Sequence, residues 1–123
     1  MMRLLILEDN QDRIEKFKIL FKNQDVCFCK TVEDAIILVA WYRDFDILWL
    51  DHDLEGKVWE NSYKEETGYQ FVKWLVRKEM CKNSLVYVHS MNPIGANLML
   101  NYLRDNAYNA IWVPFNLLKI EDK

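Results

Sequence analysis

The chain has 123 residues, a formal net charge of −3 and a pI near 5.4, and 51% of its residues are hydrophobic. This size allows one domain with a full core, and the acidic balance argues against a general nucleic-acid binder, which normally carries a basic face. The longest clearly apolar run, residues 35–42, is too short to span a bilayer, and the apolar start is too short for a signal peptide. We therefore expect one cytoplasmic domain over 1–123 with no membrane partner. Its oligomeric state stays open.

The three cysteines are an odd number without the spacing of a disulfide framework, which fits a reducing cytosol. Cys27 and Cys29 alternate with Phe28 in an expected strand, so we interpret them as small apolar residues. A zinc site would need further ligands at finger-like spacing, and the sequence lacks them.

Strand-like and helix-like patterns alternate through the first half of the chain. The first strand is expected at residues 4–8, and a helix with one apolar face follows at 11–23. A second strand is expected at 26–29, and Thr31 has the features of an N-cap that opens a second helix. The third strand is expected at 47–51.

The second half begins with a polar loop at residues 54–67, and loops of this length in compact domains are often functional. The elements expected after it are a helix at 68–81, a strand at 85–88, a helix opened by Asn92 and Pro93, a strand at 110–113, and a tail at 115–123 that is irregular or forms a short helix.

Alternating strands and helices predict an α/β fold, in which a parallel sheet has helices on both faces. Five strands at this length fit the flavodoxin-like order 2-1-3-4-5, whose ligand crevice lies between the first and third strands.

Polar residues follow three of the expected strands. The first strand ends in Glu8 and Asp9, and the third ends in Asp51, followed by His52 and Asp53. The fourth strand is followed at once by His89 and Ser90, so both histidines of the chain close an apolar run. Because ligands bind outside the carboxyl ends of parallel strands, these side chains indicate a site, and their chemistry suits catalysis.

Three short motifs resemble those of the cyclic-phosphate-processing receiver-like domains, a divergent branch of the response-regulator receivers. They are Leu-Glu-Asp-Asn at 7–10, Asp-His-Asp-Leu at 51–54, and His-Ser-Met-Asn-Pro at 89–93, followed by Gly95. The resemblance implies a receiver fold over nearly the whole chain, with Asp51 at the position of the receiver phosphoacceptor. Ordinary receivers lack both histidines.

Two positions depart from signalling receivers. Val113 stands where those receivers keep a lysine, and His89 stands where they keep the switch threonine. The lysine contacts the phosphoryl group and the threonine helps transmit the signal, so the resemblance implies that classical phosphorelay signalling is doubtful in this chain.

By resemblance, Glu8, Asp9 and Asp51 are the metal-binding acids. Three buried carboxylates would repel one another, and a hard cation such as Mg²⁺ or Mn²⁺ relieves this. The alternative is a hydrated cluster in which Asp9 or Asn10 caps the first helix.

His52 and His89 have side chains that exchange protons near neutral pH. Together they suit acid–base opening of a cyclic phosphodiester, with Asp53 and Ser90 in support. Asp53 is otherwise a metal ligand or a turn residue. If the strand stays extended past Asp51, its two-residue period turns His52 to the opposite side, so His89 is the firmer candidate.

Substrate-binding candidates lie in the fourth helix and in the 54–67 loop. Asn92 is expected to cap the helix, whose N-terminus can also bind an anion, and Gly95 either admits substrate or serves packing. In the loop, Lys57 could attract phosphate and Trp59 could stack on a base; the alternative is a solvated loop.

These observations favour a phosphodiesterase that acts on a cyclic phosphate or cyclic nucleotide with divalent metal assistance. Two alternatives stay open: a signalling receiver phosphorylated on Asp51, and a domain that sequesters a cyclic nucleotide without turnover. A metal-free reaction also stays open, as do the base and ring size of the ligand.

Overall fold

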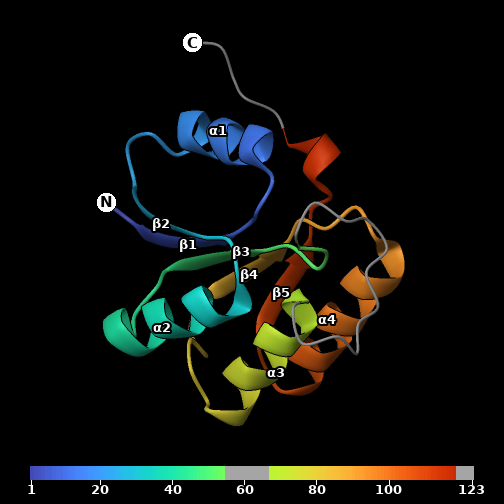
Figure 1. Ribbon diagram of the computed structural model, residues 1–123. Helices are drawn as coiled ribbons and strands as arrows, with labels where there is room; N and C mark the ends of the chain where they lie inside the picture. Colours follow the sequence, from blue (N-terminus) through green and yellow to red (C-terminus); the bar gives the residue numbers. More distant parts are fainter. Residues whose placement is uncertain (55–66, 119–123) are drawn as a thin grey trace.

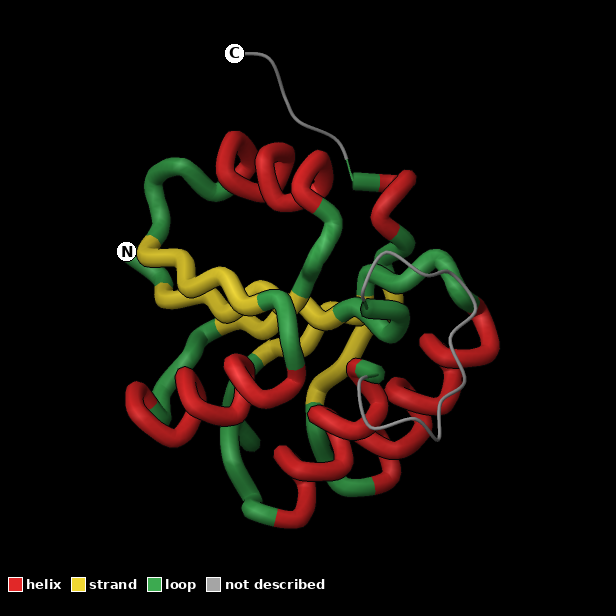
Figure 2. The backbone as a smooth tube through the Cα atoms, viewed as in Figure 1, coloured by secondary structure: helices red, strands yellow, loops and turns green. Residues whose placement is uncertain are grey.

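The structure, a computed structural model, describes residues 1–54 and 67–118. Five parallel strands form one sheet in the order β2-β1-β3-β4-β5, as the sequence predicts. Helix α1 lies on one face of this sheet, and α2, α3 and α4 lie on the other (Figures 1 and 2). The elements are β1 (Arg3–Leu7), α1 (Gln11–Leu20), β2 (Asp25–Cys29), α2 (Val32–Tyr42), β3 (Ile47–Leu50), α3 (Gly68–Arg77), β4 (Leu85–Val88), α4 (Pro93–Asp105), β5 (Asn109–Trp112) and the 3₁₀ turn η1 (Phe115–Leu117).

The interior strand β1 is apolar from Leu4 to Leu7 because both of its faces are covered. Leu4 and Ile6 belong to a core cluster with Phe17 of α1, whereas Leu5 and Leu7 belong to the larger core beneath α2, α3 and α4. Successive side chains of a strand point to opposite faces, so β1, β2, β3 and β4 contribute alternately to the two cores.

The strand register aligns the carboxyl ends of β1, β3 and β4 with one another. Leu7 is paired with Leu50, and Leu50 is paired with Val88. The ladder continues one residue further, because the Asp51 amide donates to the Leu7 carbonyl at 3.1 Å and the His89 amide donates to the Leu50 carbonyl at 3.0 Å. The next residue of each strand therefore lies at the same edge of the sheet.

Three helices begin at side-chain caps. Asn10 Oδ1 accepts from the Arg13 amide at 3.1 Å, and the Thr31 and Asn92 side chains cap α2 and α4 in the same way, as expected for both residues. Asn10, rather than Asp9, is thus the cap of α1.

Two helices end earlier than their apolar patterns predict. Helix α1 ends at Leu20 and α3 ends at Arg77, and Glu79 and Cys81 then adopt positive φ angles of 54° and 57°. A left-handed residue cannot continue a right-handed helix, so the chain turns toward β4 at this point.

The structure also describes the cysteines and the start of the tail. The three cysteines are free, and Cys29 is buried, which raises the pKa of its thiol. The tail forms only the short turn η1 within the described residues. None of the helices in residues 1–54 and 67–118 has the length and apolar character to cross a membrane.

Candidate functional site

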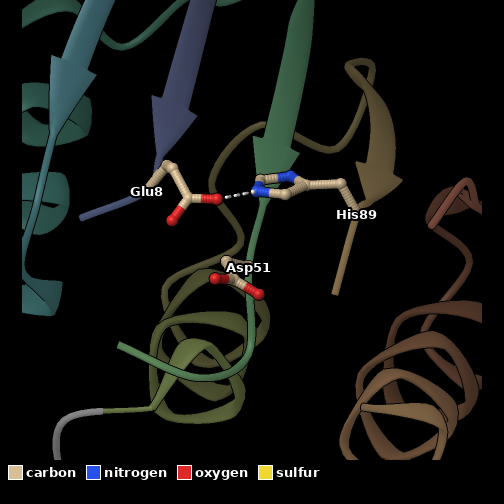
Figure 3. Close-up of side chains that lie close together, drawn as sticks. All are labelled: Glu8, Asp51 and His89. Atoms are coloured by element: carbon tan, nitrogen blue, oxygen red, sulfur yellow. Dashed lines mark hydrogen bonds and ion pairs between the residues drawn. The ribbon is translucent and has the colours of Figure 1, made fainter. Parts of the chain in front are cut away.

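Glu8, Asp51 and His89 form a buried cluster at the carboxyl ends of β1, β3 and β4 (Figure 3). One potential ligand atom from each residue lies within 4.8 Å of the other two. Each residue is two positions beyond an apolar residue of the α1-facing layer, namely Ile6, Trp49 and Tyr87. The strand period therefore turns all three side chains to the α1 side of the sheet.

The Glu8 carboxylate is held by three donors. Its Oε1 atom accepts a hydrogen bond from Nε2 of His89 at 3.1 Å. Its Oε2 atom accepts from the backbone amides of Asp9 and Asn10 at 3.0 and 3.1 Å. These bonds orient the carboxylate and require that Nε2 of His89 carries the proton.

The pKa values of the cluster are shifted in different directions. Burial raises the pKa of the Glu8 carboxyl, but the His89 hydrogen bond and further contacts outweigh burial, so the pKa is lowered overall. Burial, followed by the charge of Glu8, raises the pKa of Asp51 well above its usual value. Burial also lowers the pKa of His89, although Glu8 opposes this. At neutral pH the pair is therefore an ionised Glu8 and a neutral His89.

Aromatic rings fix the orientation of the His89 imidazole. Its ring centroid lies 5.1 Å from that of Phe17, 6.2 Å from that of Trp49 and 6.4 Å from that of Phe115. Among the described residues, its Nδ1 atom has no hydrogen-bond partner. The ring is thus held by packing on its sides and by Glu8 at Nε2.

Arg13 of α1 supplies a positive charge to the cluster, and the sequence analysis missed it. Its Nη1 atom lies 3.6 Å from Oε1 of Glu8 and 3.9 Å from Oδ2 of Asp51. The side chain is only 25% exposed, and the guanidinium stands 4.9 Å from the Phe115 ring centroid. The sequence places Arg13 in the first turn of a helix that starts just after Glu8, and this position could have indicated a contact with Glu8.

His52 belongs to a second cluster, beside α4. Its Nδ1 atom lies 2.9 Å from Oδ1 of Asp53, and the same oxygen accepts from Nδ2 of Asn92 at 3.3 Å. His52 and Asn92 are buried, and Asp53 is 7% exposed. Each histidine of the chain therefore has its own carboxylate partner.

Two glycines allow close packing around the Asp51–His52 segment. A Cβ atom at Gly95 would overlap the His52 ring, and a Cβ atom at Gly68 would overlap the Asp51 carbonyl oxygen. The Gly68 amide also donates to the His52 carbonyl at 2.9 Å. The space at Gly95 is thus filled by the imidazole.

Ser90 holds the chain between β4 and α4. Its Oγ atom accepts from the Asn92 amide at 3.0 Å, and its carbonyl accepts from Nε1 of Trp112 at 2.9 Å. Asn92 in turn accepts from the Gly95 amide at 3.1 Å. These bonds give Ser90 and Asn92 structural roles at the border of the site.

The remaining candidates lie outside the buried cluster of Glu8, Asp51 and His89 or outside the described residues. Asp9 is not among the three residues of the buried ligand group, and its side chain is partly exposed. His52 lies outside that group too, as the strand period warned, but Asp53 accompanies it because the chain leaves the extended conformation after Asp51. Lys57 and Trp59 lie outside the described residues.

The buried ligand group fits a divalent cation. Carboxylate oxygens suit Mg²⁺ and Mn²⁺, and an imidazole nitrogen is acceptable to Mn²⁺ and to other transition ions. Burial and the charge of Glu8 raise the pKa of Asp51, and Arg13 only partly offsets them. A bound cation would add positive charge there.

Five parallel strands in this order, with acids at the carboxyl ends of the first and third, define the receiver fold. A CheY-like receiver domain from Methylobacillus flagellatus is 22% identical with a TM-score of 0.62, and covers 93% of this chain and 86% of its own. The HemR receiver domain from Leptospira biflexa is 23% identical with a TM-score of 0.65 and coverages of 93% and 82%. A receiver domain from Clostridium thermocellum is 11% identical with a TM-score of 0.66 and coverages of 95% and 87%. These similarities establish the fold.

The model of the cyclic-phosphate processing receiver domain family matches residues 3–105, and the chain belongs to this family. None of the curated proteins compared with the chain matches it. The resemblance found in the sequence motifs is thereby confirmed.

Proposed function

We propose that this receiver domain hydrolyses a small cyclic phosphodiester, such as a cyclic nucleotide. One observation carries the proposal: each of two neighbouring strand ends bears an imidazole paired with a carboxylate, His52 with Asp53 and His89 with Glu8. A carboxylate partner orients an imidazole and stabilises its protonated form. The family name points to the same substrate class.

In this proposal His52 and His89 share the proton transfers. One imidazole accepts a proton from the attacking water as its oxygen bonds to phosphorus. The other gives a proton to the ribose oxygen as the ring P–O bond breaks, so the product is a linear phosphomonoester or diester. Asp53 and Glu8 position the two rings, and Ser90 and Asn92 support the backbone beside them.

The electrostatics of the site favour a divalent cation, Mg²⁺ or Mn²⁺, held by Glu8 and Asp51. Among the described residues, the carboxyls of Glu8 and Asp51 face one guanidinium, that of Arg13. An anionic phosphate would be repelled by this excess of negative charge. A bound cation would supply positive charge to the phosphate, with Asp9 at the partly exposed border.

A signalling receiver phosphorylated on Asp51 is the main rival, because this residue ends β3 in a receiver fold. Val113, which stands where signalling receivers keep a lysine, carries no charge that could contact a phosphoryl group. Incubation with acetyl phosphate and intact-protein mass spectrometry would detect an adduct on Asp51.

The proposed function includes a cytoplasmic location, because the free cysteines fit a reducing compartment.

Incubation with cyclic mono-, di- and oligonucleotides, with and without Mg²⁺ or Mn²⁺, tests the proposed function. Mass spectrometry should show a product heavier by one water molecule for at least one compound. If a compound binds but no product forms in any condition, the domain sequesters its ligand and the proposed hydrolysis is wrong.

A further inference from the structure

Arg13 places a guanidinium between the two acids of the site without forming hydrogen bonds to them. Its distances of 3.6 Å to Glu8 and 3.9 Å to Asp51 are those of ion pairs, and beyond normal hydrogen-bond length. Among the described residues, no side-chain hydrogen bond uses the guanidinium. Its N–H donors therefore remain available to an anion.

We propose that Arg13 is the phosphate-binding residue of this domain and that it shares Glu8 and Asp51 with the divalent cation. The inference rests on the proposed function and deepens it, because it names the group that recognises the phosphate. The planar fork of an arginine matches two phosphate oxygens at once.

The fold holds Arg13 ready for this role. The guanidinium lies 4.9 Å from the Phe115 ring centroid, and the Phe115 amide donates to the His89 carbonyl at 3.0 Å. The Arg13 amide is fixed by the Asn10 cap. Phe115 therefore links the Arg13 guanidinium to the end of β4, where His89 lies. We expect a phosphate bound near the imidazole to contact the guanidinium as well.

Charge balance links Arg13 to the cation in two opposite ways. A divalent cation held by Glu8 and Asp51 would neutralise the two carboxylates that attract the guanidinium, so Arg13 could turn its donors to the phosphate. Conversely, the guanidinium repels a cation that approaches the same carboxylates. Removal of the arginine should therefore weaken phosphate binding and strengthen cation binding, which a general loss of structure cannot do.

Isothermal titration calorimetry with inorganic phosphate in saturating Mg²⁺ tests the first half of this link. Arg13→Gln should weaken phosphate binding by about 10- to 100-fold, since hydrogen bonds between charged groups are lost. The phosphate affinity of Arg13→Lys should lie between those of Arg13→Gln and the wild type, because lysine keeps the positive charge but lacks the planar guanidinium. Mn²⁺ binding without phosphate, followed by electron paramagnetic resonance, should be tighter in Arg13→Gln.

Lys16 offers a matched control one turn further along α1. Its Nζ atom lies 5.7 Å from the centroid of the same Phe115 ring, and its side chain is exposed. Lys16→Gln removes the same charge from the same helix but leaves Glu8 and Asp51 untouched. This variant should bind phosphate and Mn²⁺ as the wild type does.

The proposal is overturned if the wild type with Mg²⁺ does not bind phosphate, or if Arg13→Gln binds it unchanged. It is also wrong if Lys16→Gln loses as much affinity. Should Arg13→Gln not fold, the Nε–H resonance of Arg13 in the wild type gives the answer: it should shift when phosphate is added, and a constant resonance contradicts the proposal. None of these readouts requires turnover, so a failed hydrolysis assay would leave them interpretable.

Discussion

Asp51 is a buried acid at the end of β3 whose burial bears on stability. Its carboxyl is buried next to Glu8, and these two causes raise its pKa well above the usual value of 3.8. The folded state therefore binds a proton more readily than the unfolded state. Asp51 thus lowers the free energy of unfolding as the pH rises from the unfolded pKa through the folded pKa.

Asp51→Asn should raise the melting temperature at neutral pH. The Asn side chain keeps an oxygen that can accept from the His52 amide, which in the wild type donates to Oδ1 of Asp51 at 2.8 Å. It has no carboxyl whose ionised form burial disfavours. A gain of about 0.5–2 kcal/mol is typical when a functional residue is relieved in this way. Thermal melts across pH should show the gain shrinking as the pH falls toward 3.8.

The same variant reports on the cation. Mg²⁺ or Mn²⁺ should raise the melting temperature of the wild type, because a ligand of the folded state stabilises it. Asp51→Asn should abolish this increase. A variant that is less stable than the wild type at neutral pH, or that keeps the full metal-induced increase, would contradict this interpretation of Asp51.

Gly95 controls the position of His52. A Cβ atom at this position would overlap the imidazole ring, so Gly95→Ala should displace the ring while it improves the helix propensity by about 1 kcal/mol. We expect a melting temperature close to that of the wild type and a loss of turnover of up to about 100-fold, as small misplacements of catalytic groups can produce. Asn97→Ala, at an exposed position of α4, is the control; equal activities of both variants would show that the ring position is unimportant.

At the scale of the elements, the sheet was the most predictable part of the molecule. Apolar runs with polar ends indicated the strands, and the parallel order followed from their alternation with helices. The meeting of Glu8, Asp51 and His89 follows from aligned strand ends and the two-residue period. Each of these features depends on local patterns that are visible in the sequence.

Features that depend on the direction of the chain after an element were less predictable. The pairing of His52 with Asp53 arises because the chain bends after β3, and no apolar period records that bend. The approach of Arg13 to Glu8 depends on where the first turn of α1 lies relative to the strand ends. Lys57 and Trp59, expected to contact substrate, remain predictions.

The junction between β3 and α3 gives a prediction at this scale. Gly68 starts α3 against the Asp51 carbonyl, and an added Cβ atom would overlap that backbone oxygen. Gly68→Ala must therefore shift the helix away from the strand, and we expect a destabilisation of about 1–3 kcal/mol, as for other overpacked sites. Chemical denaturation measures it, with Arg77→Ala at the exposed end of the same helix as control. If Gly68→Ala were as stable as the control, the junction could accommodate a Cβ atom at position 68 and this prediction would be wrong.

At the scale of the whole molecule, the site lies across the edge of the sheet that separates the two cores. His89 and Glu8 belong to the α1 side, together with Arg13, whereas His52 and Asp53 pack beside α4. Asp51, at the end of β3, lies with Glu8 and His89 (Figure 3), and it directly precedes His52 in the chain. The proposed reaction places the phosphate where these two groups meet, so that each side of the sheet contributes one imidazole.

The turnover of the wild type, His52→Ala and His89→Ala on one cyclic nucleotide tests this account most directly. If both imidazoles transfer protons, each variant that circular dichroism shows to be folded should lose roughly 10²–10⁴ in turnover. The wild type should show a bell-shaped pH–rate profile, whose limbs belong to the coupled pair. Full activity in either variant, or a wild type that binds the nucleotide without hydrolysing it, would contradict the two-imidazole mechanism.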